Sequence, residues 1–241
     1  MSKKSIAVID SGIGGLSILK ELKQNLPWYD YVYFADGANM PYGKKTEQEL
    51  RDIAFDVVQK ILDCFDVDLF VLACNTLTAG AIDFLRQTFP RKLFVGCEPN
   101  LTQPQREGKK NILVMSTVFT KNSKRINSRF ANRATFVEFP LLAEMIENCA
   151  PDIDIQKYLL SVLNQREQNY DAVVLGCTHY FLKRDLIEKT FCLPTYTSCL
   201  GVANRVVQLV GKNNAEYLSS LPITCFCNSK TVDLNNIICY L

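Results

Sequence analysis

A nine-residue pattern that occurs twice constrains the fold of this chain more than any other feature. Residues 68–76 read Asp-Leu-Phe-Val-Leu-Ala-Cys-Asn-Thr, and residues 171–179 read Asp-Ala-Val-Val-Leu-Gly-Cys-Thr-His, an offset of 103 residues. A second pair, residues 6–11 and 112–117, repeats at an offset of 106 residues. Because the two offsets nearly agree over about half the chain, they indicate a duplicated unit. The sequence therefore predicts two related lobes.

Short apolar runs recur along the chain, with helical patterns between them. The clearest helix carries its apolar residues on one face between Leu50 and Leu62, and Thr46 with Glu49 supplies a capping box before it. Alternation of strand and helix predicts βαβ units with mainly parallel sheets, and places ligands at the carboxyl ends of the strands. The runs are rich in Val, Ile and Phe, as buried strands are, and cover residues 6–9, 31–35, 69–73, 93–96, 112–115, 135–138 and 172–175.

The boundary between the lobes is predicted around residues 98–110, where prolines, a glycine and a polar run interrupt the pattern. The tail adds one more apolar run, Ile223 to Phe226, and a short helix around Leu234 to Tyr240, for which the second lobe has no place. We therefore expect the tail to return to the first lobe. The prediction is two pseudo-symmetric three-layer α/β lobes with the active site in the cleft between them: residues 1–98 plus about 210–241, and about 99–209.

Charge and composition argue against several classes of protein. The 27 basic and 25 acidic residues give a net charge of +2, which supplies no strong field for nucleic acid or an anionic membrane. The apolar run at residues 6–9 is too short for a signal peptide or a membrane span, so the predicted location is the cytoplasm. Ten scattered cysteines, no Cys-x-x-Cys pair and a single histidine predict reduced thiols and no metal site.

Each copy of the repeat places a cysteine directly after a buried strand. Helical patterns begin shortly afterwards, near Thr78 and Phe181, so Cys74 and Cys177 would face helix N-termini that lower a thiol pKa. Most free cysteines are buried and inert, but symmetric placement at two strand ends favours function. Two facing thiols suit inversion at a carbon stereocentre, because one removes a proton while the other returns one to the opposite face.

The carbanion formed in such a reaction needs preorganised hydrogen-bond donors. Asn75, Thr76 and Thr178 directly follow the repeated cysteines and are candidates for this role. Asp10 ends the first strand; it could simply cap a helix, or it could steer the protonation of Cys74. The lone histidine, His179, would do the same for the second cysteine.

The loop after Asp10, Gly12-Ile13-Gly14-Gly15, resembles a dinucleotide-binding fingerprint only in part. Ser17 stands where the third glycine would be, so a nucleotide site is weakly supported. Glycines here would instead let the backbone approach a carboxylate or the opposing lobe. No cofactor is predicted.

The chain resembles glutamate racemases, of the cofactor-independent aspartate/glutamate racemase superfamily. The resemblance spans nearly the whole chain and rests on residues 9–16, 34–36, 41–43, 73–76, 98–99 and 175–180. It implies that Cys74 and Cys177 racemise L- and D-glutamate, assisted by Asp10 and His179. It also implies a set of residues that hold the substrate's amino and carboxylate groups: Asp10, Ser11, Tyr42, Gly43, Asn75, Thr76, Thr117, Thr178 and His179.

The resemblance carries wider expectations as well. The family's product, D-glutamate, feeds bacterial peptidoglycan synthesis and so supports the cell wall and cell shape. Family members commonly work as homodimers whose cleft opens and closes. We therefore expect a homodimer that takes glutamate as its small-molecule substrate and binds neither nucleic acid nor membrane.

The chain departs from the family's pattern at positions near the predicted cleft. Gly37 replaces a threonine, Ser116 replaces a glycine and Phe181 replaces a proline. Ala143 stands where an acidic residue usually assists the histidine, and the carboxylate follows one residue later, at Glu144. Either Glu144 takes that catalytic role through a helical shift, or the proton chemistry of this lobe is altered.

Two other functions stay open. A pair of thiols indicates the type of reaction but not the length of the substrate's side chain. Another acidic amino acid, such as aspartate, is therefore an alternative substrate. The altered positions Gly37, Ala143 and Glu144 also permit a catalytically inactive scaffold with a binding role. Optical assays with L-glutamate and L-aspartate distinguish glutamate from aspartate as the substrate. Absence of α-proton exchange with any acidic amino acid favours the inactive scaffold.

Overall fold

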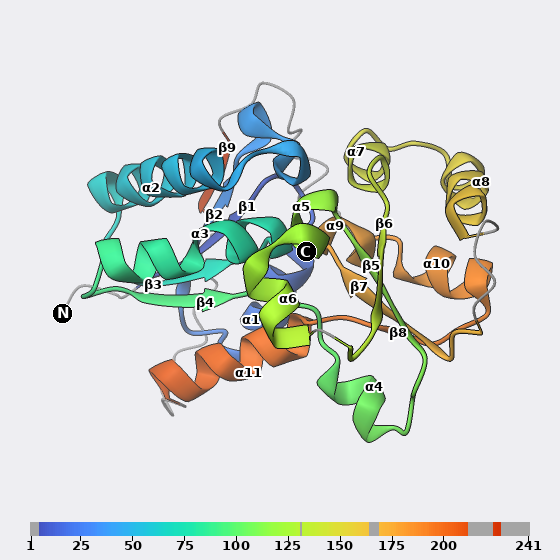
Figure 1. The fold of residues 1–241 in the computed structure, drawn as a ribbon. Coiled ribbons are helices and arrows are strands. Elements are labelled where there is room, and N and C mark those ends of the chain that lie inside the picture. The colour runs from blue at the N-terminus through green and yellow to red at the C-terminus, as the bar shows by residue number, and fades with distance from the viewer. Residues whose placement is uncertain (1–4, 131, 164–168, 212–223, 228–241) are drawn as a thin grey trace.

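One sheet of five parallel strands forms the centre of the first half of the molecule (Figure 1). The computed structural model describes residues 5–130, 132–163, 169–211 and 224–227. The strand order in this sheet is β4–β3–β1–β2–β9, and every pairing is parallel. The strands are β1 (Ser5–Asp10), β2 (Asp30–Ala35), β3 (Val67–Leu72), β4 (Leu93–Gly96) and β9 (Thr224–Cys227).

A second parallel sheet has the order β6–β5–β7–β8. Its strands are β5 (Ile112–Ser116), β6 (Thr135–Glu138), β7 (Ala172–Gly176) and β8 (Thr195–Tyr196). In reverse, this order is β8–β7–β5–β6, which matches β4–β3–β1–β2 of the first sheet. The repeats found in the sequence fall on β1 with β5 and on β3 with β7, which hold equivalent places. The predicted pseudo-symmetric pair of parallel-sheet lobes is therefore confirmed.

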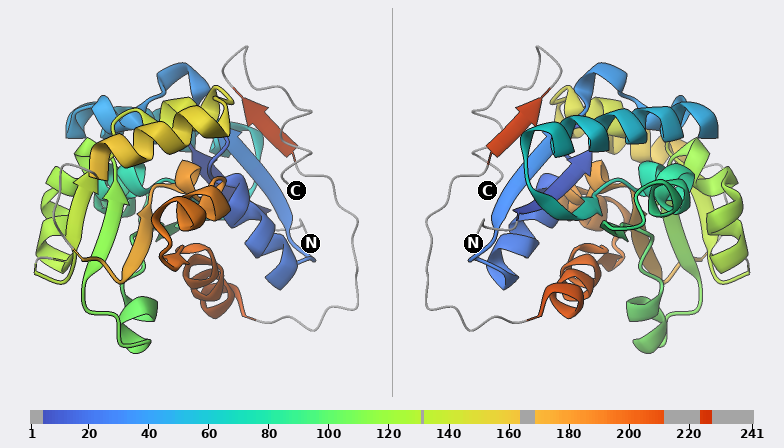
Figure 2. Two further views of the ribbon diagram at one scale, coloured as in Figure 1. Left: turned by 90° about the vertical axis from the view of Figure 1, so that its right-hand side faces the viewer. Right: turned by 90° about the vertical axis from the view of Figure 1, so that its left-hand side faces the viewer.

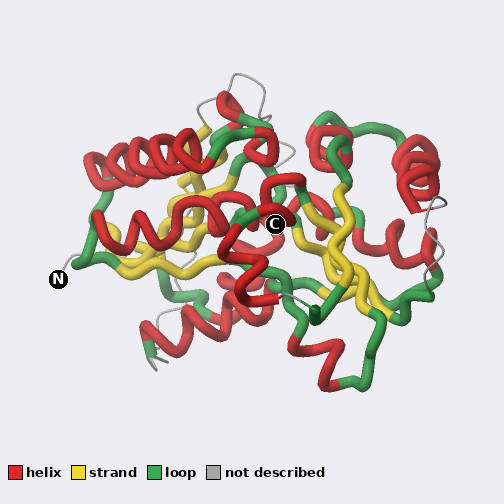
Figure 3. Tube along the Cα trace, in the orientation of Figure 1, coloured by secondary structure: helices red, strands yellow, loops and turns green. Residues whose placement is uncertain are grey.

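Helices cover both faces of the sheets, as the tube in Figure 3 shows. We call each sheet with the helices packed on it the first and the second lobe. Two single-turn 3-10 helices, η1 (Gly37–Asn39) and η2 (Tyr42–Lys44), follow β2. The α-helices are α1 (Leu16–Asn25), α2 (Glu47–Cys64), α3 (Asn75–Thr88), α4 (Thr102–Arg106), α5 (Val118–Asn122), α6 (Lys124–Phe130), α7 (Leu142–Glu147), α8 (Asp152–Leu163), α9 (Thr178–Phe181), α10 (Arg184–Phe191) and α11 (Cys199–Val210).

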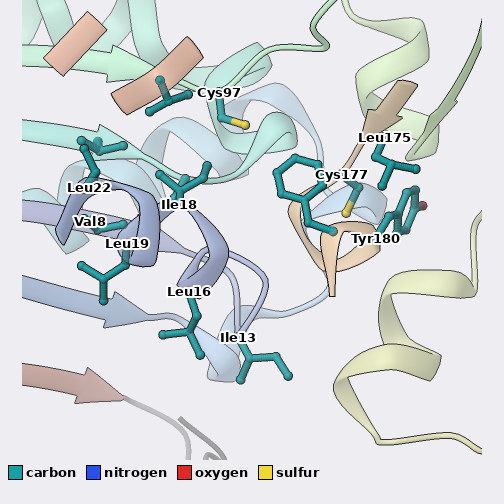
Figure 4. Close-up of a cluster of buried hydrophobic side chains, with 14 of the residues drawn as sticks. Val8, Ile13, Leu16, Ile18, Leu19, Leu22, Cys97, Leu175, Cys177 and Tyr180 are labelled. Atoms are coloured by element: carbon teal, nitrogen blue, oxygen red, sulfur yellow. The ribbon is translucent and has the colours of Figure 1, made fainter. Parts of the chain in front are cut away.

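Strand β1 shows why the predicted runs are so apolar. Ile6 and Val8 lie in the core cluster that includes α1, whereas Ala7 and Ile9 lie in the cluster that includes α2 and α3. A strand buried on both faces needs apolar residues at consecutive positions. Figure 4 shows part of the first cluster, with Val8 of β1 among the leucines of α1. The sheet is thus held rigidly, with its carboxyl ends free to carry polar residues.

The first turn of α2 confirms the predicted capping box. The Thr46 side chain accepts a hydrogen bond from the Glu49 backbone N–H, and the Glu49 carboxylate accepts one from the Thr46 N–H. Two of the backbone donors that a helix N-terminus leaves unpaired are satisfied in this way.

The end of the described chain lies against the first lobe. Strand β9 pairs with β2, from Val32 opposite Thr224 to Ala35 opposite Cys227 (Figure 2). Helix α11, which the sequence analysis placed in the second lobe, packs on α1 and contacts β4 of the first lobe. The helix predicted around Leu234 to Tyr240 lies outside the described residues. Within the described ranges, no helix has the length and apolar character needed to cross a membrane.

Candidate active site

Cys74 and Cys177 occupy equivalent places just past the carboxyl ends of β3 and β7. Each is the N-cap residue of the following helix, α3 or α9. Both side chains are largely buried, with 6% and 7% of their surface exposed, and both line the same pocket of about 40 Å³. Figure 4 shows Cys177 between β7 and the start of α9. The pocket also brings together six residues expected at the site: Ser11, Tyr42, Gly43, Thr76, Thr117 and His179.

Asp10 lies fully buried at the end of β1 and joins the two lobes. The Gly15 N–H donates to its Oδ2 atom at 2.8 Å, and Thr178 Oγ1 of the second lobe donates to Oδ1 at 3.4 Å. Burial raises the pKa of Asp10 to about 6, although the charge of His179 and the Gly15 N–H act in the opposite direction. A carboxyl group with such a pKa can take up and release protons near neutral pH.

His179 lies between a thiol and a carboxylate. Its Nδ1 atom is 4.0 Å from Cys177 Sγ, and its Nε2 atom is 2.7 Å from Glu147 Oε2. Burial acts to lower the pKa of His179, but the hydrogen bonds to Cys177 and Glu147 and the charges of Cys177 and Asp10 outweigh it. The pKa of His179 therefore lies well above its ordinary value. The arrangement favours a protonated imidazole beside the thiol.

Glu147 reaches across the cleft to the glycine loop of the first lobe. The Ile13 N–H donates to Glu147 Oε2 at 3.1 Å, and a Cβ atom added to Gly12 would lie 2.4 Å from the same oxygen. A Cβ atom added to Gly14 would lie 2.5 Å from the backbone nitrogen of His179. The loop glycines thus permit close approach both to a carboxylate and to the opposing lobe, as the sequence suggested.

Glu144 does not take the place that the sequence analysis gave it. It forms an ion pair with Lys44, at 2.7 Å between Oε1 and Nζ, while Glu147 contacts His179. The two acids are three residues apart on α7, less than one turn, and Glu147 is the one that faces the glycine loop and His179. Both acids are visible in the sequence. The sequence analysis chose Glu144 because the family's acidic position, located by its distance from Pro140, lies next to it.

The helix N-terminus does not lower the thiol pKa at Cys74, contrary to the expectation from sequence. Burial raises the pKa of Cys74 well above its ordinary value, and the charge of Asp10 raises it further; the Leu77 N–H acts in the opposite direction. Desolvation of the thiolate in the closed pocket outweighs the backbone donors. The helices also begin three residues earlier than predicted, at Asn75 and Thr178.

Polar side chains near the thiols connect the two lobes by hydrogen bonds, and one of these side chains has a donor without a partner among the described residues. Thr76 of the first lobe and Thr117 of the second lie 2.9 Å apart between their Oγ1 atoms. Asn75 Oδ1 accepts a hydrogen bond from Cys97 at 3.5 Å, while Asn75 Nδ2 is buried with no partner among the described residues. Tyr42 donates to the buried Asp36 at 2.6 Å. Among the described residues, no cluster of three or more His, Cys, Asp or Glu side chains could hold a metal ion.

The glycine loop supports a stability prediction. Gly14→Ala is expected to lower the free energy of unfolding by about 1–3 kcal/mol, because the new methyl group would lie 2.5 Å from the backbone nitrogen of His179, which no side-chain rotation can move. Gly201→Ala is the control: no atom would lie within 4 Å of its Cβ, and alanine in α11 should add roughly 0.5–1 kcal/mol. Urea unfolding measures both, and equal changes of the same sign would contradict the close approach of the glycine loop to the backbone of α9.

Known proteins resemble this chain in sequence. The glutamate racemase of Clostridium acetobutylicum is 37% identical over 192 residues, covering 75% of this chain and 74% of the relative. The glutamate racemase of Fusobacterium nucleatum is 35% identical over 224 residues, covering 87% and 82%. No family model matches the chain.

Solved structures share the fold. Escherichia coli glutamate racemase in complex with L-glutamate and the activator UDP-MurNAc-Ala has a TM-score of 0.83 at 23% identity, covering 95% of this chain and 91% of that one. Francisella tularensis glutamate racemase in complex with D-glutamate has a TM-score of 0.79 at 24% identity, covering 94% and 88%. The curated relatives and the shared fold define an amino-acid racemase, an isomerase. The chain belongs to the glutamate racemase family.

Proposed function

We propose that this chain interconverts L-glutamate and D-glutamate without a cofactor, with Cys74 and Cys177 as the two acid/base groups. The observation that carries the proposal is the single pocket into which both thiols open from equivalent strand ends. Membership of the family supports glutamate as the substrate.

The reaction starts with one thiolate and one thiol on opposite faces of the α-carbon. The thiolate removes the α-hydrogen as a proton, and the electron pair of the C–H bond passes into the adjacent carboxylate. The other thiol then donates its proton to the opposite face, which re-forms a C–H bond with inverted configuration. Thiol and thiolate have exchanged places, and the reverse reaction uses the same groups in the opposite order.

Asp10 and His179 would set the protonation of the two thiols. The charge of Asp10 raises the pKa of Cys74, so this carboxylate, whose own pKa is about 6, would keep the proton on sulfur while the site is empty. His179 would serve Cys177 at 4.0 Å, with Glu147 orienting the imidazole. An ammonium group on the substrate would offset the negative charge around Asp10 and favour thiolate at Cys74.

The substrate's polar groups would be held by residues from both lobes. Ser11, Tyr42, Gly43, Thr76 and Thr117 line the pocket, and the unpartnered Asn75 Nδ2 supplies a further donor. A buried donor without a partner is unfavourable, so a carboxylate oxygen that accepts from it gains affinity. Thr178 donates to Asp10 and would therefore position the Asp10 carboxylate.

We also propose a cellular setting, on the strength of the family resemblance. The D-glutamate formed would supply peptidoglycan synthesis in the cytoplasm, and so the cell wall and cell shape. The chain would act as a homodimer, which sedimentation of the purified protein can test.

The primary test uses the purified protein and each glutamate enantiomer in deuterated water. We expect loss of optical rotation from either side, with deuterium at the α-carbon of the product. L-Aspartate is the comparison substrate: faster racemisation of aspartate would favour the alternative substrate. No α-proton exchange with either amino acid would favour the inactive scaffold.

Glu147 supplies a further prediction. Glu147→Gln should lower kcat by about a hundredfold, because the imidazole loses the carboxylate that keeps it protonated. The pKa of His179 should fall, so the part of the pH–rate profile that depends on its proton should move to lower pH. Glu144→Gln, on the same helix but facing Lys44, should keep kcat within about twofold. Equal losses of kcat in the two variants would contradict these assignments.

A further inference from the structure

A third buried thiol follows a strand of the first sheet and contacts Asn75. Cys97 comes directly after β4, and none of its surface is exposed (Figure 4). Its backbone N–H donates to Thr78 Oγ1 at 3.0 Å, and that hydroxyl donates to the Leu72 carbonyl at 3.2 Å. The backbone of Cys97 is thus held against α3 by contacts that do not involve its sulfur atom.

The Cys97 thiol is the middle member of a chain of hydrogen bonds. Ser198 Oγ lies 2.9 Å from Cys97 Sγ, and Cys97 donates to Asn75 Oδ1 at 3.5 Å. Burial raises the pKa of Cys97 well above its ordinary value, so the sulfur keeps its hydrogen at neutral pH. Since a thiol has one hydrogen, that hydrogen goes to Asn75 and Ser198 donates to the sulfur.

This order of donation decides which end of the Asn75 amide is free. Oδ1 faces the donor Cys97, and Nδ2 is buried without a partner among the described residues. Asn75 stands between Cys74 and Thr76, which both line the thiol pocket. A ligand oxygen that accepts from the buried Nδ2 removes the cost of leaving this donor unpaired.

Cys97 also lies where the two connections between the lobes meet. The chain leaves the first lobe after β4 and returns to it between β8 and α11, where Ser198 lies. Beside the contact of Ser198 with Cys97, Asn100 Nδ2 donates to the Thr197 carbonyl at 3.1 Å. The Asn75 amide is therefore supported by both connections, and not by its own helix alone.

We infer that Cys97 is a positioning residue: held by Ser198, its thiol fixes the Asn75 amide with Nδ2 directed at the α-carboxylate of the substrate. The inference rests on the proposed function. The α-carboxylate receives the electron pair of the broken C–H bond, so its oxygens gain negative charge in the transition state. An amide that is already oriented stabilises this charge without reorganising. Without the thiol the amide can turn over, and Oδ1 would then repel the carboxylate.

Cys97→Val and Cys97→Ser form a matched pair of variants. Valine removes the hydrogen-bonding sulfur at similar volume and should lower kcat/KM for glutamate about fivefold, because the Asn75 amide is no longer oriented. Serine keeps a donor and an acceptor at the same place and should stay within about twofold of the wild type. Equal losses in the two variants overturn the inference, and so does full activity in Cys97→Val.

A double-mutant cycle with Asn75→Ala shows whether the loss passes through the amide. Cys97→Val should have no further effect on kcat/KM in the Asn75→Ala background, because no amide is left to orient. If Cys97 only fills space, valine lowers kcat/KM by the same factor in both backgrounds, and the inference is overturned. The rate of α-proton exchange in deuterated water supplies the same comparison where racemisation of Asn75→Ala is slow.

Two further variants control for folding and for changes near the connection. Cys199→Val alters a half-buried thiol outside the thiol pocket and should leave kcat/KM unchanged. Ser198→Ala removes the hydroxyl that sets the direction of the Cys97 hydrogen and should lower kcat/KM about two- to threefold. The Ser198 side chain makes no capping hydrogen bond to α11, so alanine leaves this helix intact. If circular dichroism shows that Cys97→Val does not fold, full activity in Ser198→Ala overturns the inference.

A binding measurement separates this inference from the proposed function. In calorimetric titration, the affinity for L-glutamate should fall about threefold in Cys97→Val and stay near the wild-type value in Cys97→Ser. If the wild type binds glutamate without racemising it, the proposed function fails, while the loss of affinity in Cys97→Val still supports Cys97. If racemisation is confirmed but Cys97→Val matches the wild type in affinity and kcat/KM, the inference alone fails.

Discussion

Cys74→Ala and Cys177→Ala should each lower the racemisation of glutamate by at least about a thousandfold, because inversion needs an acid and a base on opposite faces. The two variants should differ in what they retain. A single remaining thiolate can still remove and return a proton on the face that it occupies. Each variant should therefore exchange the α-hydrogen of one enantiomer with deuterated water, and the two variants should choose opposite enantiomers.

Folding should survive both changes, since alanine removes one sulfur atom and no large core volume. Circular dichroism and urea unfolding establish this for each variant. Cys199→Ala, which alters a half-buried thiol outside the pocket, is the matched control and should keep full activity. Near-normal turnover in either Cys74→Ala or Cys177→Ala defeats the two-thiol mechanism.

Asp10→Asn should stabilise the protein at pH 8 by up to about 3 kcal/mol while lowering its activity. Burial raises the pKa of Asp10 from 3.8 to about 6, so the folded protein holds this proton more tightly than the unfolded chain. The stability linked to that proton is present below about pH 4 and is lost as the pH rises through 6. The asparagine carries no charge to bury, so its advantage should appear above pH 6 and vanish below pH 4.

Urea unfolding of wild type and Asp10→Asn at pH 4 and pH 8 measures the effect. Asp56→Asn, an exposed position on α2, should change stability by less than about 0.5 kcal/mol at both values. A lower stability for Asp10→Asn at pH 8 would mean that the Gly15 and Thr178 hydrogen bonds, rather than burial, dominate the energetics of this carboxylate.

Much of the fold could be predicted from the sequence, because parallel strands covered on both faces are continuous apolar runs. The run at residues 69–73 corresponds to β3, Val67–Leu72, and the capping box before α2 lies where Thr46 and Glu49 place it. Strand β8 was not predicted, because Thr195–Tyr196 is too short to form a run. Helix α11 was placed in the other lobe, since its apolar face does not show which sheet covers it.

Some residues of the candidate site could likewise be predicted from the sequence, and others could not. The duplicated motif points to Cys74 and Cys177 directly, because equivalent strand ends carry them. Glu147 could not be chosen over Glu144 from sequence, since the choice depends on how α7 packs against a loop in the other lobe. The pKa of Cys74 could not be predicted either, because burial sets it and no local pattern reports burial.

The position of the Glu147 side chain between the two lobes bears on the timing of the reaction. The carboxylate that orients His179 belongs to one lobe and is held by the Ile13 N–H of the other. If the lobes part to exchange substrate for product, that hydrogen bond breaks and the imidazole loses its support. The proposed proton-transfer groups would then be in place only while the lobes are closed, when bulk water could not reach the carbanion.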